Sequence, residues 1–535
     1  MSTRLKWPII LAIGLLSSGL ALIYISMNWV TVIDDTYIYF RYAQNIRNGY
    51  GYVFNIGQPV EGTTSIAWTI LLVGFDYLNV PLVLATKILG VLSVLAVLAV
   101  LGIALDKRSV RGSTTVLVLC LLLFNPHFVP SIMMGLETGL FAVCVLVFSI
   151  IANSYLQTRG KEYGVELGAI GVLLFLTRPE SIGILLIIGV GLIGTRLVTP
   201  RRYSLRPIAI WILGVSAITL WRWFTFGDYI PNSARAKSIF EFSTVFLGVL
   251  WPRIQAGMLY TKTLILVSPL LVIFGIFGLV ALRKSYLGLV GFIVLCVGFG
   301  TVLLNSGDWM PFSRLLTSYL PLVALLAAVG MNHIQNQLGK SGKHIFELTS
   351  VLLTVAVIAH SFWLIRDRTP FVAENWPSGR CYEQVGVVLR PYLSQQTVIA
   401  PEAIGILGYA VDTVPILDFF GLTDAEIARH GTIPIETYTL GKHDYEYVMQ
   451  RHPEIFLFHS HITNHIPLLN QWGYAQDYDT FSMRSPNLQC QLIIGLDRSV
   501  SPSLQPILSQ KFELESIDVT VLQKSPAATW PFGEN

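Results

Sequence analysis

Two adjacent carboxylates stand at the end of the first long apolar run of the chain, in the stretch "TVIDDTYIYFRYAQNIRNGYGYVFN". One acid, Asp34 or Asp35, can take the proton from an attacking hydroxyl group while the other orients that hydroxyl or binds sugar hydroxyls. A structural role fits equally well, with Asp34 as the N-cap and Asp35 in the first turn of a helix over 35–48, followed by Gly49 as its C′ residue. The sequence leaves both interpretations open.

Two arginines raise a similar question further along the chain. Arg178 ends an apolar run in "LFLTRPES", and Arg314 begins one in "GDWMPFSRLL". A guanidinium group at such a place needs an anionic partner. That partner is either a nearby carboxylate, Glu137 or Glu180 for Arg178 and Asp308 for Arg314, or the phosphate group of a substrate.

Further charged residues lie in the loops between apolar runs. Because a charge in or near a membrane is costly unless a partner satisfies it, such residues suggest a functional site. We expect the loops on one side of the membrane to converge on a single cavity. The residues expected to line it are Arg41, Glu61, Glu137, Glu180, Arg222, Asp228, Arg235, Lys237 and Asp308. For Arg235 and Lys237, a solvated loop face is the commoner explanation.

The composition is that of a polytopic membrane protein. Of the 535 residues, 53% are hydrophobic and 13% are charged, against about 25% charged residues in a soluble domain. A helix needs about 20 residues to cross the bilayer core, so the shorter apolar runs indicate extended or broken helices. "TTSIAWTILLVGFDYLN" (63–79) fits a re-entrant or interfacial segment. We expect eleven spans, near 8–30, 80–105, 113–124, 138–155, 165–177, 181–196, 207–226, 263–282, 286–304, 314–331 and 344–365.

The loop charges predict the orientation in a plasma (inner) membrane. Loops such as "DKRSVR" (106–111) and "LRKSYLG" (282–288) are basic and alternate with loops such as "TRPES" and "NSGDWMPFSR". Basic loops face the cytoplasm. The N-terminus, with its own basic start, is therefore expected inside, and the loops that carry the candidate residues are expected outside. The net charge of +4 is explained by these loops, so no nucleic-acid partner is expected.

After residue 366 the apolar runs become short and are separated by polar, Gly- and Pro-containing stretches. We therefore expect a membrane domain over 1–365 and a soluble, extracytoplasmic α/β domain over 366–535. This second domain holds Cys381 and Cys490, which are either bridged or two unrelated thiols. No cysteine spacing or dense acidic cluster suggests a metal, so no cofactor is expected, although a divalent metal near the carboxylates is not ruled out.

These features predict an enzyme that draws on a lipid carrier. Outside the cytoplasm there is no nucleotide-sugar pool, whereas a polyprenyl-phosphate sugar keeps its tail in the bilayer and its phosphate at the outer interface. Arginines would stabilise the leaving phosphate, and a carboxylate would activate the acceptor hydroxyl. Two alternatives are a transporter or flippase of lipid-linked sugars, and a membrane-anchored glycan-binding protein without catalysis.

The block "DDTYIYFRYAQNIRNGYGYVFNIGQPVEG" resembles the first outer loop of GT-C glycosyltransferases similar to the mycobacterial terminal β-(1→2) arabinosyltransferases. The resemblance continues in order through "MMGLETGLF", "LTRPES", "FTFGDYIPNSARAKS", "GDWMPFSRLLTSYLPL" and "LDFFGLTDAEIARHG". It implies an integral membrane glycosyltransferase with a polyprenyl-phosphate sugar donor and, as acceptor, a cell-envelope glycan or glycolipid.

The resemblance also implies roles for particular residues. An acid of the first outer loop is the base, which carries over to Asp34 and Asp35. Blocks expected to line the cavity include those that contain Glu137, Arg178, Asp308 and Arg314. In "NSARAKS" the family has an uncharged or aromatic residue where this chain has Arg235. This difference leaves the identity of the donor's sugar head group open. By resemblance the candidate donor is decaprenyl-phosphoarabinose, which carries arabinofuranose.

Overall fold

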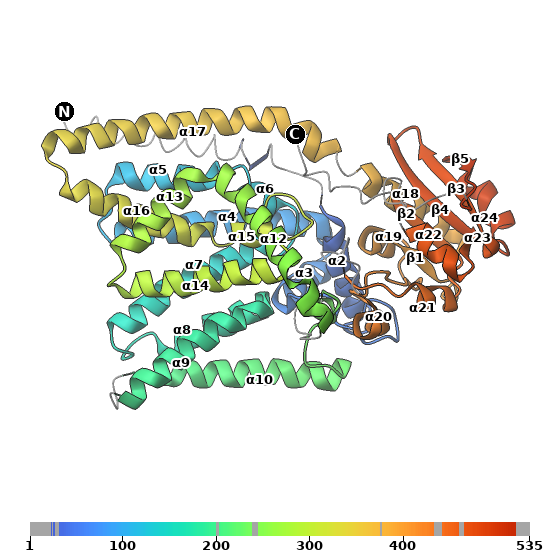
Figure 1. The fold of residues 1–535 in the computed structure, drawn as a ribbon, viewed down its shortest axis with the longest axis horizontal. Coiled ribbons are helices and arrows are strands. Elements are labelled where there is room, and N and C mark those ends of the chain that lie inside the picture. The colour runs from blue at the N-terminus through green and yellow to red at the C-terminus, as the bar shows by residue number, and fades with distance from the viewer. Residues whose placement is uncertain are drawn as a thin grey trace. The chain divides into compact units, whose positions relative to one another are not determined.

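The computed structural model describes residues 23, 25–26, 32–198, 203–237, 244–374, 377–432, 441–459 and 465–520 (Figure 1). By its internal contacts the chain divides into two units. We call Met1–Thr31, Val83–Ala217 and Ile254–Ala373 the helical unit, and Val32–Leu82, Ile218–Arg253 and Glu374–Asn535 the mixed unit. The C-terminal segment thus belongs to one unit with two earlier segments of the chain.

The apolar runs form helices, with a few breaks inside them. The first predicted run, 8–30, lies almost wholly outside the described residues. The helices of this part of the chain are α4 (Leu82–Asp106), α5 (Gly112–Leu123), α6 (Phe128–Met133), α7 (Thr138–Gln157), α8 (Gly164–Thr177), η1 (Pro179–Ser181), α9 (Ile182–Val198), α10 (Arg206–Phe226), α12 (Thr244–Val267), α13 (Pro269–Ala281), α14 (Tyr286–Leu304), α15 (Arg314–Thr317), α16 (Leu320–Gln337) and α17 (Lys340–Glu374).

Among the described residues, six helices are long and apolar enough to cross a membrane, and a seventh span results if α12 and α13 count as one. These two helices meet at an angle of 100°, next to Pro269 in the first turn of α13. The predicted run 314–331 is interrupted between α15 and α16, and α3, α5 and α8 are shorter apolar helices. The chain is therefore a multi-pass helical protein, but the predicted number of eleven spans is not confirmed.

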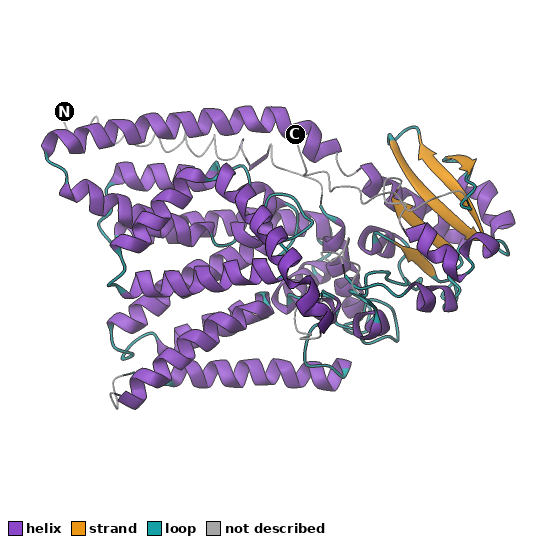
Figure 2. Ribbon diagram, in the orientation of Figure 1, coloured by secondary structure: helices purple, strands orange, loops and turns teal. Residues whose placement is uncertain are grey.

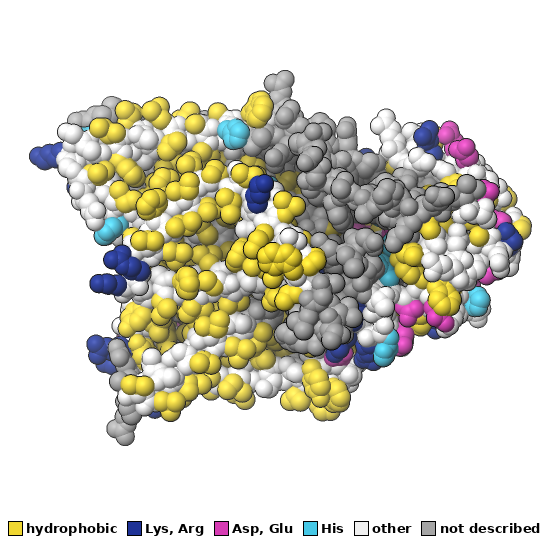
Figure 3. Space-filling model, in the orientation of Figure 1, with side chains coloured by type: hydrophobic (Ala, Val, Ile, Leu, Met, Phe, Trp, Pro, Cys, Tyr) yellow, Lys and Arg dark blue, Asp and Glu magenta, His cyan; other side chains and the backbone are white. Residues whose placement is uncertain are grey.

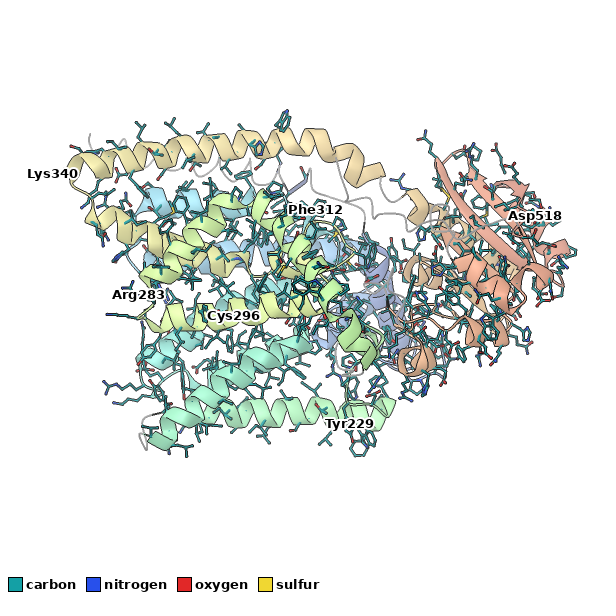
Figure 4. The ribbon with its side chains drawn as sticks, viewed as in Figure 1. Tyr229, Arg283, Cys296, Phe312, Lys340 and Asp518 are labelled. Atoms are coloured by element: carbon teal, nitrogen blue, oxygen red, sulfur yellow. A yellow bond between two sulfur atoms is a disulfide. The ribbon has the colours of Figure 1, made fainter. Side chains whose placement is uncertain are left out.

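The helical unit has one basic end. Tyr203, near the start of α10, contacts Tyr155 near the end of α7 and Tyr286 at the start of α14, which brings three basic loops together. Arg111 and Glu347 join the loop after α4 to α17 at 3.1 Å. Figure 3 shows Lys and Arg side chains gathered at this end and hydrophobic side chains along the helices, and Figure 4 labels Arg283 and Lys340 there.

The mixed unit begins with α2 (Asp34–Arg47) and α3 (Ile66–Tyr77) and includes α11 (Asn232–Ala236). Its C-terminal segment carries a five-stranded sheet of order β1-β2-β4-β3-β5, in which β1 and β2 are parallel and the other pairs are antiparallel (Figure 2). Its elements are α18 (Pro377–Leu389), η2 (Arg390–Tyr392), β1 (Ile399–Pro401), α19 (Ile404–Ala410), α20 (Ala425–His430), α21 (Tyr445–Gln450), β2 (Ile455–His459), α22 (His465–Leu469), η3 (Asn470–Trp472), α23 (Tyr474–Asp477), β3 (Tyr478–Ser485), β4 (Cys490–Asp497), α24 (Ser501–Leu508) and β5 (Glu513–Ser516).

Arg41 joins α2 to this C-terminal segment. Its guanidinium group donates to the carbonyl oxygens of Phe54 (2.8 Å), Gly408 (2.8 Å) and Val414 (2.7 Å). It also stacks on the ring of Phe54. With 2% exposure, Arg41 is a buried bridge between segments more than 350 residues apart, so its predicted place in the lining of a cavity finds no support in its contacts.

Cys381 on α18 and Cys490 on β4 form a disulfide, with their Cα atoms 6.3 Å apart. Of the two possibilities that the sequence left open, the bridge is the correct one. It closes a loop over a sequence separation of 109 residues and fastens α18 to the sheet.

The disulfide should contribute to thermal stability. A loop of this length corresponds to about 4–5 kcal/mol in the chain-entropy model, and commonly to less in practice. We expect Cys381→Ser/Cys490→Ser to lower the Tm of the purified protein, and reductant to lower the wild-type Tm equally while leaving the double variant unchanged. Cys296→Ser, at an exposed free thiol, is the control. Equal melting of wild type and double variant would contradict the prediction.

Candidate functional site

Asp34 is a capping residue, but for a helix other than its own. The N-cap of α2 is Ile33, and Asp34 is the first residue of the helix. The Asp34 carboxylate accepts hydrogen bonds from the backbone N–H groups of Gly405 (3.0 Å) and Ile406 (2.7 Å) in the first turn of α19. The prediction that Asp34 is the N-cap of its own helix is therefore wrong, because its carboxylate instead binds the first turn of a helix 371 residues further along the chain.

The two adjacent acids have different surroundings. Asp34 is 5% exposed, and burial raises its pKa to about 7, against the lowering effect of the Ile406 and Gly405 hydrogen bonds. The charge of Asp35 adds to this increase. Asp35 is half-buried and follows in the same turn of α2. Both oxygens of Asp34 accept hydrogen bonds, and Asp35 is the more exposed of the two carboxylates.

Glu61 and Arg222 form a buried ion pair. Arg222 Nε lies 2.7 Å from Glu61 Oε2, and Nη2 lies 3.1 Å from Oε1, which is a bidentate geometry. Burial raises the pKa of Glu61, and Arg222 opposes this increase. The carbonyl oxygen of Glu61 accepts from the N–H group of Asn232, whose side chain donates to carbonyl oxygens of the loop before α20. The pair thus fastens three segments of the mixed unit together.

The charged residues of "GDYIPNSARAKS" also find local partners. Arg235 pairs with both oxygens of Asp228, at 3.0 and 2.8 Å, and Arg429 lies 3.7 Å from the same carboxylate. The pKa of Asp228 is lowered, because these hydrogen bonds outweigh partial burial. Lys237 is half-buried, and its carbonyl oxygen accepts from Arg253. Tyr229, labelled in Figure 4, stacks on Trp223.

A second group of charged residues lies in the helical unit, and we call it the arginine cluster: Glu137, Arg178, Glu180, Asp308 and Arg314. Arg178 Nε and Nη2 each lie 3.0 Å from Glu137 Oε1, and Glu180 lies 3.8 Å away. Arg314 pairs with Asp308 and lies 3.8 Å from the same oxygen of Glu137. Both arginines therefore have the carboxylate partners that the sequence offered as the alternative to phosphate.

The arginine cluster is buried apart from one member. The side chains of Glu137, Arg178, Asp308 and Arg314 are between 3% and 10% exposed, whereas Glu180 is 29% exposed. Glu137 Oε1 lies within 4 Å of both guanidinium groups. A phosphate group that entered here would compete with these carboxylates for the arginines, which is a chemically sound way to bind and later release an anion.

Two sets of residues were missed in the sequence. Lys87 on α4 is buried, and its amine donates to the carbonyl oxygen of Met133 on α6, next to the turn that leads to Glu137. The sequence feature that could have revealed it is a lysine inside the apolar run "PLVLATKILG".

The second set is centred on Glu402, which lies between His459 and His465 at 3.0 Å from each. The sequence feature that could have revealed it is the histidine-rich stretch "HSHITNH". Among the described residues no group of three or more His, Cys, Asp or Glu side chains is arranged to hold a metal ion.

The candidate residues thus form separate groups, each inside one unit. The mixed unit contains Asp34, Asp35, Arg41, Glu61, Arg222, Asp228, Arg235 and Lys237, and the helical unit contains the arginine cluster. The first group offers carboxylates that suit proton transfer, and the second offers guanidinium groups that suit an anion.

One of the comparisons with known proteins bears on the fold. A model for a domain of unknown function (DUF8728) matches residues 373–496, and no curated protein matches the sequence significantly. The structure is similar to the crystal structure of ArnT from Cupriavidus metallidurans in the apo state, with a TM-score of 0.53 and 13% identity over 92% of this chain and 98% of that chain. For the same protein bound to undecaprenyl phosphate the TM-score is 0.49 with 13% identity, over 91% and 99% of the chains. The first similarity supports the expected GT-C fold.

The Glu61–Arg222 pair should be costly to break from one side. Removing one partner of a buried ion pair leaves an uncompensated charge, which costs about 3–5 kcal/mol. We expect Arg222→Met to lower the Tm strongly, and Glu61→Gln/Arg222→Met to recover part of the loss. The matched control is Arg390→Met, which breaks the exposed Arg390–Asp412 pair at 2.9 Å and should cost less than about 1 kcal/mol. Equal Tm changes for the two single arginine variants would contradict the prediction.

Proposed function

We propose that this chain is a membrane glycosyltransferase that transfers a sugar from a polyprenyl-phosphate donor to a cell-envelope glycan or glycolipid at the outer face of the membrane. The observation that carries the proposal is the acidic turn of α2. There a buried Asp34 is held by two amide groups, and Asp35 follows it half-buried. The similarity of the fold to ArnT, a GT-C glycosyltransferase, supports it.

In the proposed reaction, the acceptor hydroxyl oxygen forms a bond to the anomeric carbon of the donor sugar. The bond between that carbon and the phosphate oxygen breaks, and polyprenyl phosphate leaves with the electron pair. Asp35 takes the hydroxyl proton, while Asp34 fixes the turn. Within the helical unit, Arg178 and Arg314 offer positive charge that suits a phosphate group, the role that the sequence resemblance implies for them. Lys87 of the same unit donates to the carbonyl oxygen of Met133, beside the turn between α6 and α7.

The orientation is part of the proposal. The basic end of the helical unit is assigned to the cytoplasm by the charge rule for membrane loops, which puts the N-terminus inside and the acidic turn outside. The Cys381–Cys490 bridge supports an extracytoplasmic C-terminal segment, because disulfides persist in oxidising compartments and are rare in the cytosol. The plasma (inner) membrane is the compartment that fits both points.

The identity of the sugar rests on the sequence resemblance alone. By that resemblance the donor is decaprenyl-phosphoarabinose and the transferred sugar is arabinofuranose. A panel of polyprenyl-phosphate sugars, incubated with the purified protein and analysed by mass spectrometry, tests this assignment. Movement of intact donor across vesicles without a new glycosidic bond would favour a flippase, and binding of glycan without turnover would favour a glycan-binding protein.

The first prediction from this proposal concerns the acids. Asn keeps an oxygen that can accept a hydrogen bond but is not a base, so Asp35→Asn should reduce kcat by about 10²–10⁴-fold. Asp34→Asn should reduce it less, since the cap persists. The matched control is Glu166→Gln, which changes an exposed acid in the first turn of α8. Normal turnover by both aspartate variants would leave capping as the only role of this turn.

The second prediction concerns the arginines. Lysine keeps the positive charge but loses the planar, bidentate fork. Arg178→Lys and Arg314→Lys should therefore raise the KM for the donor or lower kcat, with little change in Tm. Arg196→Lys, at the basic end of the helical unit, serves as the control. If both variants kept the wild-type donor KM and kcat, the arginine cluster would be structural only.

A further inference from the structure

Glu402 lies at the carboxyl edge of the two parallel strands of the mixed unit. It follows β1 directly, and its N–H group donates to the carbonyl oxygen of Leu457 on β2 at 2.9 Å. Its Oε2 lies 3.0 Å from Nδ1 of His459, the last residue of β2. Its Oε1 lies 3.0 Å from Nε2 of His465, the first residue of α22. One carboxylate therefore joins the ends of two strands and the start of a helix.

Glu402 remains ionised although it is buried. Burial would raise its pKa, but the hydrogen bonds from His459 and His465 prevail and hold the pKa at about 2. Two tyrosines complete the surroundings. The Tyr382 hydroxyl group lies 3.5 Å from His459 Nδ1, and the Tyr445 hydroxyl group lies 2.9 Å from His465 Nδ1. A buried anion with two imidazole partners is costly to assemble, which suggests that its charge has a purpose.

The chain connects this cluster to the acidic turn of α2 within a few residues. Gly405 stands three positions after Glu402, and Gly405 and Ile406 are the residues whose N–H groups hold Asp34. An electrostatic connection runs in parallel, since His459 lowers the pKa of Asp34 against the larger effect of burial. The contacts that hold Glu402 in place therefore also hold in place the N–H groups of Gly405 and Ile406, which donate to Asp34.

We propose that Glu402 and His459 are positioning residues for the acidic turn: their contact joins the ends of β1 and β2, and it holds in place the connection from β1 to α19, whose N–H groups bind the Asp34 carboxylate. This inference rests on the proposed function for its effect on turnover. It adds a second task to the C-terminal segment, which supports an acid near the start of α2.

The proposal predicts a shift in the pH dependence of turnover. Activity falls as the acidic turn becomes protonated at low pH. His459 lowers the pKa of Asp34, and glutamine carries no charge, so His459→Gln should raise this pKa and move the acidic limb of kcat to higher pH. We expect kcat to fall about tenfold, which is less than loss of a general base costs, with the donor KM unchanged. Other charged or titratable groups that act on this turn are Asp35, Tyr37, Tyr382, Glu383, Glu402 and Tyr409, and none of them is altered in this variant.

A stability measurement tests the same connection without any substrate. The pKa of Asp34 is raised from 3.8 to about 7 in the folded chain, so the stability gained from its protonated form is lost as the pH rises through this window. Wild type and Asp34→Asn should therefore diverge in Tm between these pH values. In a His459→Gln background the divergence should extend to higher pH, because Asp34 then ionises later.

The matched control is Asp418→Asn. Asp418 is a fully buried acid of the same segment that accepts hydrogen bonds from Phe420 and Thr423. Burial raises its own pKa to about 6, so Asp418→Asn should change the pH dependence of Tm independently of His459. It should leave the acidic limb of kcat in place. Glu402→Gln should behave like His459→Gln, with a larger fall in Tm. If the effects of Asp34→Asn and His459→Gln on Tm are additive at every pH, the inference is wrong. If they are coupled but wild type makes no product from any donor, the positioning role stands and the proposed function fails.

Discussion

The hydrogen bonds between the Asp34 carboxylate and the first turn of α19 are the contact on which the arrangement of the mixed unit depends. They join the start of α2 to a helix 371 residues later. The buried guanidinium group of Arg41 makes a parallel connection about two turns further along α2. Each group is taken out of water at a considerable cost, which several hydrogen bonds to main-chain groups offset. As a result, the acidic turn is tied to the C-terminal segment by two hydrogen bonds of Asp34 and two of Arg41.

Several charged side chains of both units are paired with groups of opposite charge. Glu61 with Arg222, Asp228 with Arg235, and Glu402 with its histidines are all paired at 3.0 Å or less. Such pairs add specificity more reliably than stability. The arginine cluster differs because Glu137 lies close to two guanidinium groups at once. A substrate anion that bound there, as proposed, would compete with these carboxylates for the guanidinium groups.

Much of the fold could be predicted from the sequence, because apolar runs of sufficient length have few alternatives to helix. The break between α15 and α16 inside the predicted run 314–331 was missed, although Pro321 lies in the first turn of α16. The disulfide was one of two possibilities for Cys381 and Cys490, and the pairs of Arg178 and Arg314 were likewise named among alternatives. The capping of α19 by Asp34 could not be predicted, since the spacing of residues says nothing about a contact across most of the chain. The Glu402 cluster was missed because its members come from three separate elements.

The division of the mixed unit into three segments has a consequence for biogenesis. Its first segment, Val32–Leu82, leaves the ribosome long before the final one, Glu374–Asn535, and the helices of the other unit are made in between. At roughly 5–20 residues per second, α2 waits about 20–75 s for the amide groups that will hold Asp34. During this time Asp34 and Arg41 lack their native partners from the C-terminal segment. Assembly of the mixed unit is therefore completed only after its last segment has been made.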